Sequence, residues 1–98
     1  MHTLTALPWW RDNPDPTRLC AAFYAVTGRP ITPHGRTWIN MSCILPGHPD
    51  KRPSFGFNAN TGAWCCHGCG RRGDLAGLVM ELYGMGFREA RTFLEGVN

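Results

Sequence analysis

Cys66-His67-Gly68-Cys69-Gly70 is the most informative segment of this chain. Two cysteines separated by two residues at a tight turn present two thiolates to one metal ion, as in many structural zinc sites. The two glycines relieve the steric cost of the turn, and its backbone N–H groups can donate hydrogen bonds to the sulfurs. This stretch, called the knuckle below, therefore predicts one half of a metal site.

The other half of the site is expected upstream, where Cys43 and His48 flank a Pro-Gly turn. With Cys66 and Cys69 they form the pattern Cys-x4-His-x17-Cys-x2-Cys. Two ligand pairs separated by a strand hairpin are typical of a zinc ribbon. We therefore predict one structural Zn²⁺ ion held by these four residues.

Other uses of the cysteines compete with this prediction. A redox pair at Cys66 and Cys69 would call for a strand–helix–strand setting, which the pattern lacks, and an iron–sulfur cluster usually takes four cysteines. Cys65 and His67 could substitute for a ligand. Strand alternation nevertheless places Cys65 on the face opposite Cys66, which favours both as non-ligands.

Length and composition fit one small domain that depends on a metal for stability. The chain has 98 residues, of which 43% are hydrophobic and 17% charged. A core this small often needs a metal or disulfides, and five cysteines, an odd number, favour a metal in a reducing compartment. No apolar run reaches the roughly 18 residues of a membrane span and no signal peptide is evident. We expect a cytoplasmic protein that does not contact a membrane.

The hydrophobic pattern predicts an α+β fold: a short antiparallel sheet with metal knuckles, an N-terminal helix and two C-terminal helices. Residues 1–14 show no periodicity and are expected to form an extended arm, followed by a single zinc-binding domain over 15–98 with its ribbon core at 37–94. Short aromatic or β-branched segments predict strands at 37–43, 54–58 and 63–67, with a hairpin turn at 58–62.

Capping residues set the expected helix ends. Asp15 is expected to cap a helix that begins at Pro16 and stops at Gly28. Asp74 is expected to cap a second helix that ends at Gly84, and a third begins near residue 86. Cys20 lies on the apolar stripe of the first helix, where a buried thiol is expected.

Positive charge gathers around the proposed ligands. The net charge of the chain is +3. Between residues 29 and 73 one acid, Asp50, stands against six basic residues: Arg29, Arg36, Lys51, Arg52, Arg71 and Arg72. A basic segment with interleaved aromatic residues is typical of proteins that bind single-stranded nucleic acid, because phosphates pair with cations and bases stack on rings.

The segment from Cys43 to about Leu94 resembles the zinc-binding domain of bacterial and phage replicative primases, which has one histidine among three cysteines. The shared motifs are Pro53-Ser54-Phe55, Trp64-Cys65-Cys66-His67-Gly68-Cys69-Gly70, Gly73-Asp74 and the helix–turn–helix that includes Val79-Met80-Glu81 and Gly84-Met85-Gly86-Phe87-Arg88-Glu89-Ala90. Two features depart from the family. The first ligand pair has four intervening residues where primases usually have two, and residues 1–36 match no pattern that we recognise.

The resemblance implies a role in holding single-stranded DNA template for primer synthesis and DNA replication. Seven scattered acids show no carboxylate cluster for Mg²⁺, so we expect a non-catalytic accessory domain that works with a separate polymerase or primase subunit. The candidate nucleic-acid contacts are Arg36, Trp38, Lys51, Arg52, Phe57, Trp64, Arg71 and Arg72.

Two alternatives to these contacts stay open. Each aromatic residue could pack in the core instead, with Phe55 the first candidate for the core and Trp38 the first for the surface, and the basic residues could form a solvated rim. The chain could also be a protein-interaction adaptor of a phage or mobile element that engages replication machinery through Trp9 and Trp10.

Overall fold

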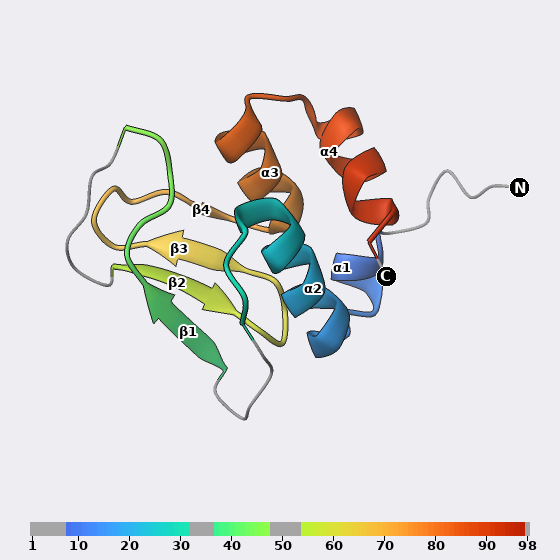
Figure 1. Cartoon of the computed structure of the whole chain (residues 1–98), viewed down its shortest axis with the longest axis horizontal. Helices are drawn as coiled ribbons and strands as arrows, with labels where there is room; N and C mark the ends of the chain where they lie inside the picture. Colours follow the sequence, from blue (N-terminus) through green and yellow to red (C-terminus); the bar gives the residue numbers. More distant parts are fainter. Residues whose placement is uncertain (1–7, 32–36, 48–53, 98) are drawn as a thin grey trace, which may run out of the picture.

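A four-stranded antiparallel sheet lies beside the helices of the computed structural model, which describes residues 8–31, 37–47 and 54–97 (Figure 1). The strands are β1 (Trp38–Met41), β2 (Phe55–Asn58), β3 (Trp64–Cys66) and β4 (Arg72–Gly73), and their spatial order follows the chain. The three expected strands are confirmed. No local pattern predicted β4, which is two residues long and pairs with β3 as the chain returns from the knuckle.

The helices are α1 (Trp9–Asp12), α2 (Pro16–Thr27), α3 (Leu75–Tyr83) and α4 (Phe87–Glu95). The predicted caps are confirmed: Asp15 accepts from the N–H of Thr17 at 3.1 Å, and Asp74 accepts from the N–H of Gly77 at 2.9 Å. Gly28 and Gly84 end their helices with φ of 74° and 65°, values that favour glycine. Among the described residues no helix has the length and apolar character needed to cross a bilayer.

The helices cover one face of the sheet, and that face forms the core. Alternation places Phe55 and Phe57 on the covered face, where Phe57 contacts Phe23 of α2 with ring centroids 4.5 Å apart. Phe55 stacks on Trp64 of β3 at 5.7 Å. Further large core side chains come from α2, α3 and α4: Leu19, Val26, Leu75, Leu78, Val79 and Leu94. Cys20 is buried, as expected.

The hairpin turn predicted at 58–62 is confirmed, and the side chain of one asparagine organises it. The Asn58 side chain accepts hydrogen bonds from the N–H groups of Asn60 (2.9 Å) and Thr61 (3.1 Å). Gly62 then takes φ of 79°, which only a residue without Cβ adopts readily. This turn fixes the register that pairs Phe57 with Trp64.

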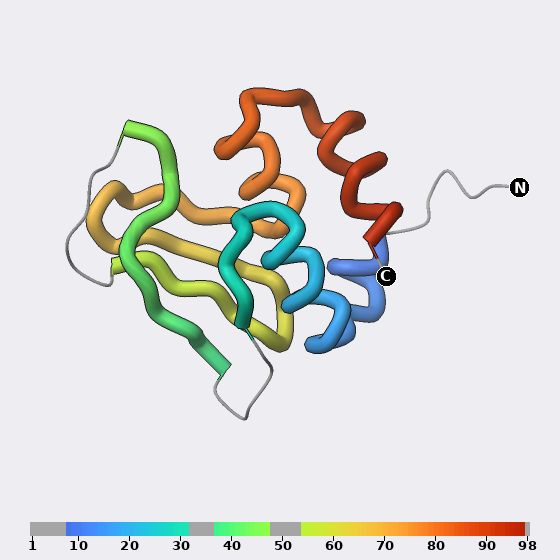
Figure 2. The backbone as a smooth tube through the Cα atoms, in the orientation of Figure 1, coloured from blue at the N-terminus to red at the C-terminus, as the bar shows by residue number. Residues whose placement is uncertain are grey.

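The N-terminal segment differs from the extended arm that we expected. Residues 9–12 form a helical turn, and Trp10 is buried at 2% exposure. The Trp9 indole donates to the carbonyl of Leu94 at 3.1 Å, and the Arg18 guanidinium lies 4.1 Å from the Trp9 ring centre. Figure 2 shows this segment beside the C-terminal helix, far along the chain. The expectation of an extended arm was wrong for these residues because burial of two indoles favours a docked turn.

Candidate metal centre

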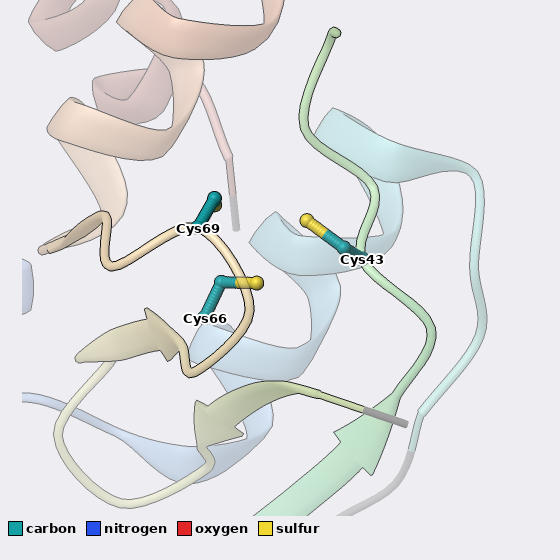
Figure 3. Close-up of side chains that lie close together, drawn as sticks. All are labelled: Cys43, Cys66 and Cys69. Atoms are coloured by element: carbon teal, nitrogen blue, oxygen red, sulfur yellow. The ribbon is translucent and has the colours of Figure 1, made fainter. Parts of the chain in front are cut away.

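Three cysteine sulfurs come together between the loop after β1 and the knuckle. The Sγ atoms of Cys43, Cys66 and Cys69 all lie within 4.8 Å of one another. Cys66 ends β3, Cys69 lies in the turn before β4, and Figure 3 shows the Cys43 side chain directed from its loop toward that turn. Thiolates at 2.3 Å from a tetrahedral zinc ion are about 3.8 Å apart, so a small contraction of the cluster would seat the ion.

Backbone hydrogen bonds shape the knuckle before any metal binds. The N–H of Cys66 donates to the carbonyl of Arg71, and the N–H of Gly70 donates to the carbonyl of Cys66, both at 2.8 Å. Gly70 reverses the chain with φ of 76°. The two cysteines are therefore held on one tight turn by local bonds, as their spacing predicted.

Cys66 is the sulfur whose surroundings favour the thiolate most. Burial alone would raise the pKa of its thiol, but hydrogen bonds from the Ser54 hydroxyl, the Cys69 N–H and the neighbouring thiols lower the pKa to about 6. The Ser54 oxygen lies 3.5 Å from the Cys66 sulfur. A serine and a backbone donor that orient a sulfur are typical supports of a structural metal site.

The pKa of the Cys43 thiol is shifted in the opposite direction. Burial, followed by the nearby charge of Cys66, raises the pKa of the Cys43 thiol to about 11. Negative charge is thus concentrated on Cys66, and binding a divalent cation would favour ionisation of the remaining thiols with release of protons. Three clustered sulfur donors at this separation suit zinc, which prefers cysteine and histidine ligands.

The fourth predicted ligand, His48, lies outside the described residues, so the complete ligand set stays a prediction. Of the two flanking candidates, Cys65 points to the opposite face from Cys66 and lies across from Arg72 of β4. His67 is exposed. Within the part of the chain that the structure describes, neither joins the sulfur cluster.

Arg71 ties the metal centre to the helices. Its guanidinium donates to the Glu81 carboxylate of α3 at 3.0 Å and to the carbonyl of Pro46 at 3.1 Å. The Glu81 contact, followed by a hydrogen bond to the Cys69 sulfur, raises the pKa of Arg71. The side chain therefore joins the knuckle, the upstream turn and α3, which favours a structural role over the phosphate contact that we expected.

The predicted nucleic-acid contacts divide into three groups. Phe57 and Trp64 are 0% and 2% exposed, so the prediction that they stack on bases was wrong, because the helices cover their face of the sheet. Trp38 is 43% exposed and Arg72 is exposed, both on the opposite face. Arg36, Lys51 and Arg52 lie outside the described residues.

Sequence reasoning missed the position of Asn40 on the sheet face and the long-range contacts of Asp74. Asn40 is exposed two residues after Trp38 on the same strand, and the alternation of β1 would have placed it beside that tryptophan. Asp74 does more than cap α3, because its side chain also accepts from Trp10 and its carbonyl accepts from the Trp64 indole at 2.6 Å. Contacts over such sequence separations leave no local signal.

Comparison with known proteins agrees with this geometry. Residues 31–96 match the family model of the CHC2 zinc finger, the DnaG-type zinc ribbon. The chain is 42% identical over 55 residues to a DNA primase of Lactococcus lactis, a match that covers 56% of this chain and 9% of the primase. It is 36% identical over 59 residues to a DNA primase of Clostridium acetobutylicum, covering 60% of this chain and 10% of the primase.

The chain therefore spans about a tenth of the length of the curated relatives that it matches. The family model in contrast covers more than half of the chain and includes Cys43, Cys66 and Cys69. On this evidence the chain belongs to the CHC2 zinc finger family.

Proposed function

We propose that this chain is a zinc-dependent module that binds single-stranded DNA template and supports primer synthesis with a separate polymerase subunit. The observation that carries the proposal is the combination of a primase-type zinc ribbon with an uncovered sheet face that bears Trp38 and Arg72. An exposed ring and a nearby cation suit the two parts of a single strand, since bases stack on aromatic faces and phosphates pair with cations.

A non-catalytic role accompanies this proposal. All four proposed zinc ligands are protein groups, which leaves no position for a zinc-activated water. Among the described residues the one cluster of potential metal ligands is the cysteine cluster, with no group of carboxylates for Mg²⁺. Phosphodiester chemistry would then belong to another polypeptide or domain, to which this module presents the template.

The test is a titration of fluorescent single-stranded DNA with the zinc-loaded protein at two salt concentrations. Arg72→Ala should weaken binding and reduce the slope of log affinity against log salt by about 0.7. Trp38→Ala should weaken binding at both salt concentrations. Phe87→Ala and Arg88→Ala are matched controls, since both residues are exposed on α4, and they should leave affinity unchanged. Equal losses of DNA affinity in the two sheet-face variants and the two control variants would refute the proposal. Failure of the intact protein to bind DNA would also refute it.

The adaptor function is the second candidate, and one feature of the helical side favours it. Ala25, Val79, Tyr83, Met85 and Phe93 line an apolar groove of about 220 Å³ between α2, α3 and α4. Burial of Trp10 in the core removes half of the tryptophan pair that we had expected to hold a partner. Phe93→Ala separates the two candidates, because a change in this groove should weaken binding to a protein partner and leave the affinity for single-stranded DNA unchanged.

A further inference from the structure

The outer face of the sheet, the one without helices, carries a row of side chains that crosses all four strands. Asn40 of β1 lies opposite Gly56 of β2, Gly56 opposite Cys65 of β3, and Cys65 opposite Arg72 of β4. The two ends of the row are exposed, and its middle is a glycine and a half-buried cysteine. The row thus has two small residues in its middle, between the amide of Asn40 and the guanidinium of Arg72.

The side chains of Trp38 and Asn40 both lie over Gly56. A Cβ atom at Gly56 would lie 3.3 Å from the Asn40 Oδ1 and 3.3 Å from the Trp38 Cε3. The indole and the amide therefore lie side by side over the glycine, which they bury. An aromatic ring that covers a glycine stabilises a sheet, and this accounts for the inner side of the indole.

Covering Gly56 does not account for the solvent-exposed side of Trp38 and Asn40. Trp38 is 43% exposed, and Asn40 is exposed with no hydrogen bond from its amide to the described part of the chain. The amide offers a donor and an acceptor side by side, next to an aromatic ring that is partly exposed. These are the two features that bind a base, because stacking holds the ring and paired hydrogen bonds read its edge.

We propose that Trp38 and Asn40 form a subsite for one unpaired base, in which the base stacks on the indole and the Asn40 amide reads its edge. Adenine is the base that fits best, since its N6 amino group and N7 form a two-bond pair with asparagine. This inference rests on the proposed single-strand binding and adds base selectivity to it.

Arg72 completes the subsite from the far end of the row. Strands in a sheet are about 4.8 Å apart, which places the Arg72 backbone roughly 14 Å from that of Asn40. Phosphates follow one another at least 3.4 Å apart along a strand, so this separation is crossed within about four nucleotides. Arg72 therefore contacts a phosphate within about four nucleotides of the stacked base and contributes affinity without selectivity.

The experiment compares twelve-nucleotide thymine strands that carry adenine, guanine, cytosine or thymine at one central position. Each unlabelled strand competes with a labelled thymine strand for the zinc-loaded full chain. Central adenine should bind about fivefold or more tighter than central thymine. Asn40→Ala should abolish this preference and leave the affinity for the all-thymine strand within about twofold, whereas Trp38→Ala should weaken all four strands.

Two further variants make the result specific. Asn40→Asp keeps the size of the side chain but removes its donor, so it should also lose the adenine preference. Asn13→Ala, at the exposed asparagine that ends α1, should keep it. Figure 1 shows α1 on the helical side of the molecule. Circular dichroism and zinc content show whether each variant is folded.

The outcomes distinguish this inference from the function on which it rests. Salt-sensitive binding with equal affinity for all four strands would overturn the subsite and leave single-strand binding standing. A preference for central adenine that survives Asn40→Ala would also overturn the subsite and leave single-strand binding standing. Failure of every strand to bind would refute both.

Discussion

Asp74 joins the N-terminal segment to the ribbon through a single carboxylate. Its oxygens accept hydrogen bonds from the Gly77 N–H at 2.9 Å, the Trp10 indole at 3.2 Å and the Arg11 guanidinium at 2.9 Å. Burial works against the charged form of Asp74, but these donors prevail and lower the pKa of the carboxyl. Part of the stability of the fold thus depends on ionisation of this residue.

The stability of the protein should therefore fall in acid. The pKa of Asp74 is lower in the folded chain than its unfolded value of about 3.9, so the stabilisation is complete above that value and is lost as pH falls through the folded pKa. Asparagine caps helices as well as aspartate does. Asp74→Asn should then cost about 1 kcal/mol at pH 7 and flatten the acid side of the stability curve.

Urea unfolding between pH 2 and pH 7 measures this effect. Asp15→Asn is the matched control, because the Asp15 carboxylate caps α2 by accepting from the Thr17 N–H and makes no contact with Trp10 or Arg11. It should change stability by a few tenths of a kcal/mol at most. Equal losses in the two variants would show that the contacts to Trp10 and Arg11 contribute nothing beyond capping.

The ligand assignment can be tested by substituting one side chain at a time. Cys43→Ser, Cys66→Ser, Cys69→Ser and His48→Ala should each reduce bound zinc well below one ion per chain, because a structural site needs all four ligands. Cys65→Ser and His67→Ala should keep full occupancy. Metal content after dialysis, determined by atomic spectrometry, is the measurement. Loss of zinc in either of the last two variants would require a different ligand set.

The covered face of β2 could have been predicted in full from the sequence. Phe55 was expected in the core, and Phe57 shares its face because side chains alternate with a period of two. Both are fully buried. The turn at 58–62 sets the register that pairs Trp64 with Phe57, whereas alternation within residues 63–67 does not by itself reveal which face of that strand is covered.

Helix ends were predicted well because capping is a local interaction. Asp15 and Asp74 each accept from an N–H two or three residues away, and the glycines that end α2 and α3 need only a positive φ. The short elements α1 and β4 depend on partners that are distant or formed by a turn. Periodicity cannot reveal a four-residue helix that is stabilised by contacts with Leu94 and Asp74.

The β2–β3 turn should be sensitive to any side chain at Gly62. An alanine there would take φ near 79° and place its Cβ 2.8 Å from the Leu19 Cδ2 of α2, so Leu19 would have to move. Gly28→Ala meets the same backbone strain at φ 74° with no atom within 4 Å. We expect Gly28→Ala to cost about 1 kcal/mol and Gly62→Ala about 2 kcal/mol or more.

Thermal or urea denaturation of the two alanine variants measures the difference. The excess cost at Gly62 is the free energy of displacing Leu19 from the core. Variants of equal stability would show that Leu19 adapts without cost and that the turn packs loosely on α2.

The N-terminal segment and the ribbon share one core. Residues 8–30 precede the stretch that matches the CHC2 zinc finger model, yet they supply buried side chains to the same cluster as β2 and α3: Trp10, Leu19, Ala22, Phe23 and Val26. Apolar burial on this scale contributes about 1.5–3 kcal/mol for each large side chain. The fold consequently has two sources of stability, the apolar core and the proposed metal centre, which adjoin at Cys66, a member of the core cluster that pairs with Phe55.

Removing zinc should separate these two sources. The knuckle is held by a few backbone hydrogen bonds, and a zinc ion on the cysteine cluster would join it to the loop at Cys43, whereas α2 and α3 are held by buried apolar side chains. A chelator should therefore lower the melting temperature and speed amide hydrogen exchange first at residues 43–47 and 66–71. Amides in the middle of α2 and α3 should stay protected, because Cys66 is one member of a core cluster around Phe23 and Leu78 that is otherwise built from apolar side chains. Hydrogen exchange followed by NMR tests this order. Simultaneous loss of protection throughout the chain would mean that the apolar core cannot hold the fold without zinc, as in zinc fingers that unfold when the metal is removed.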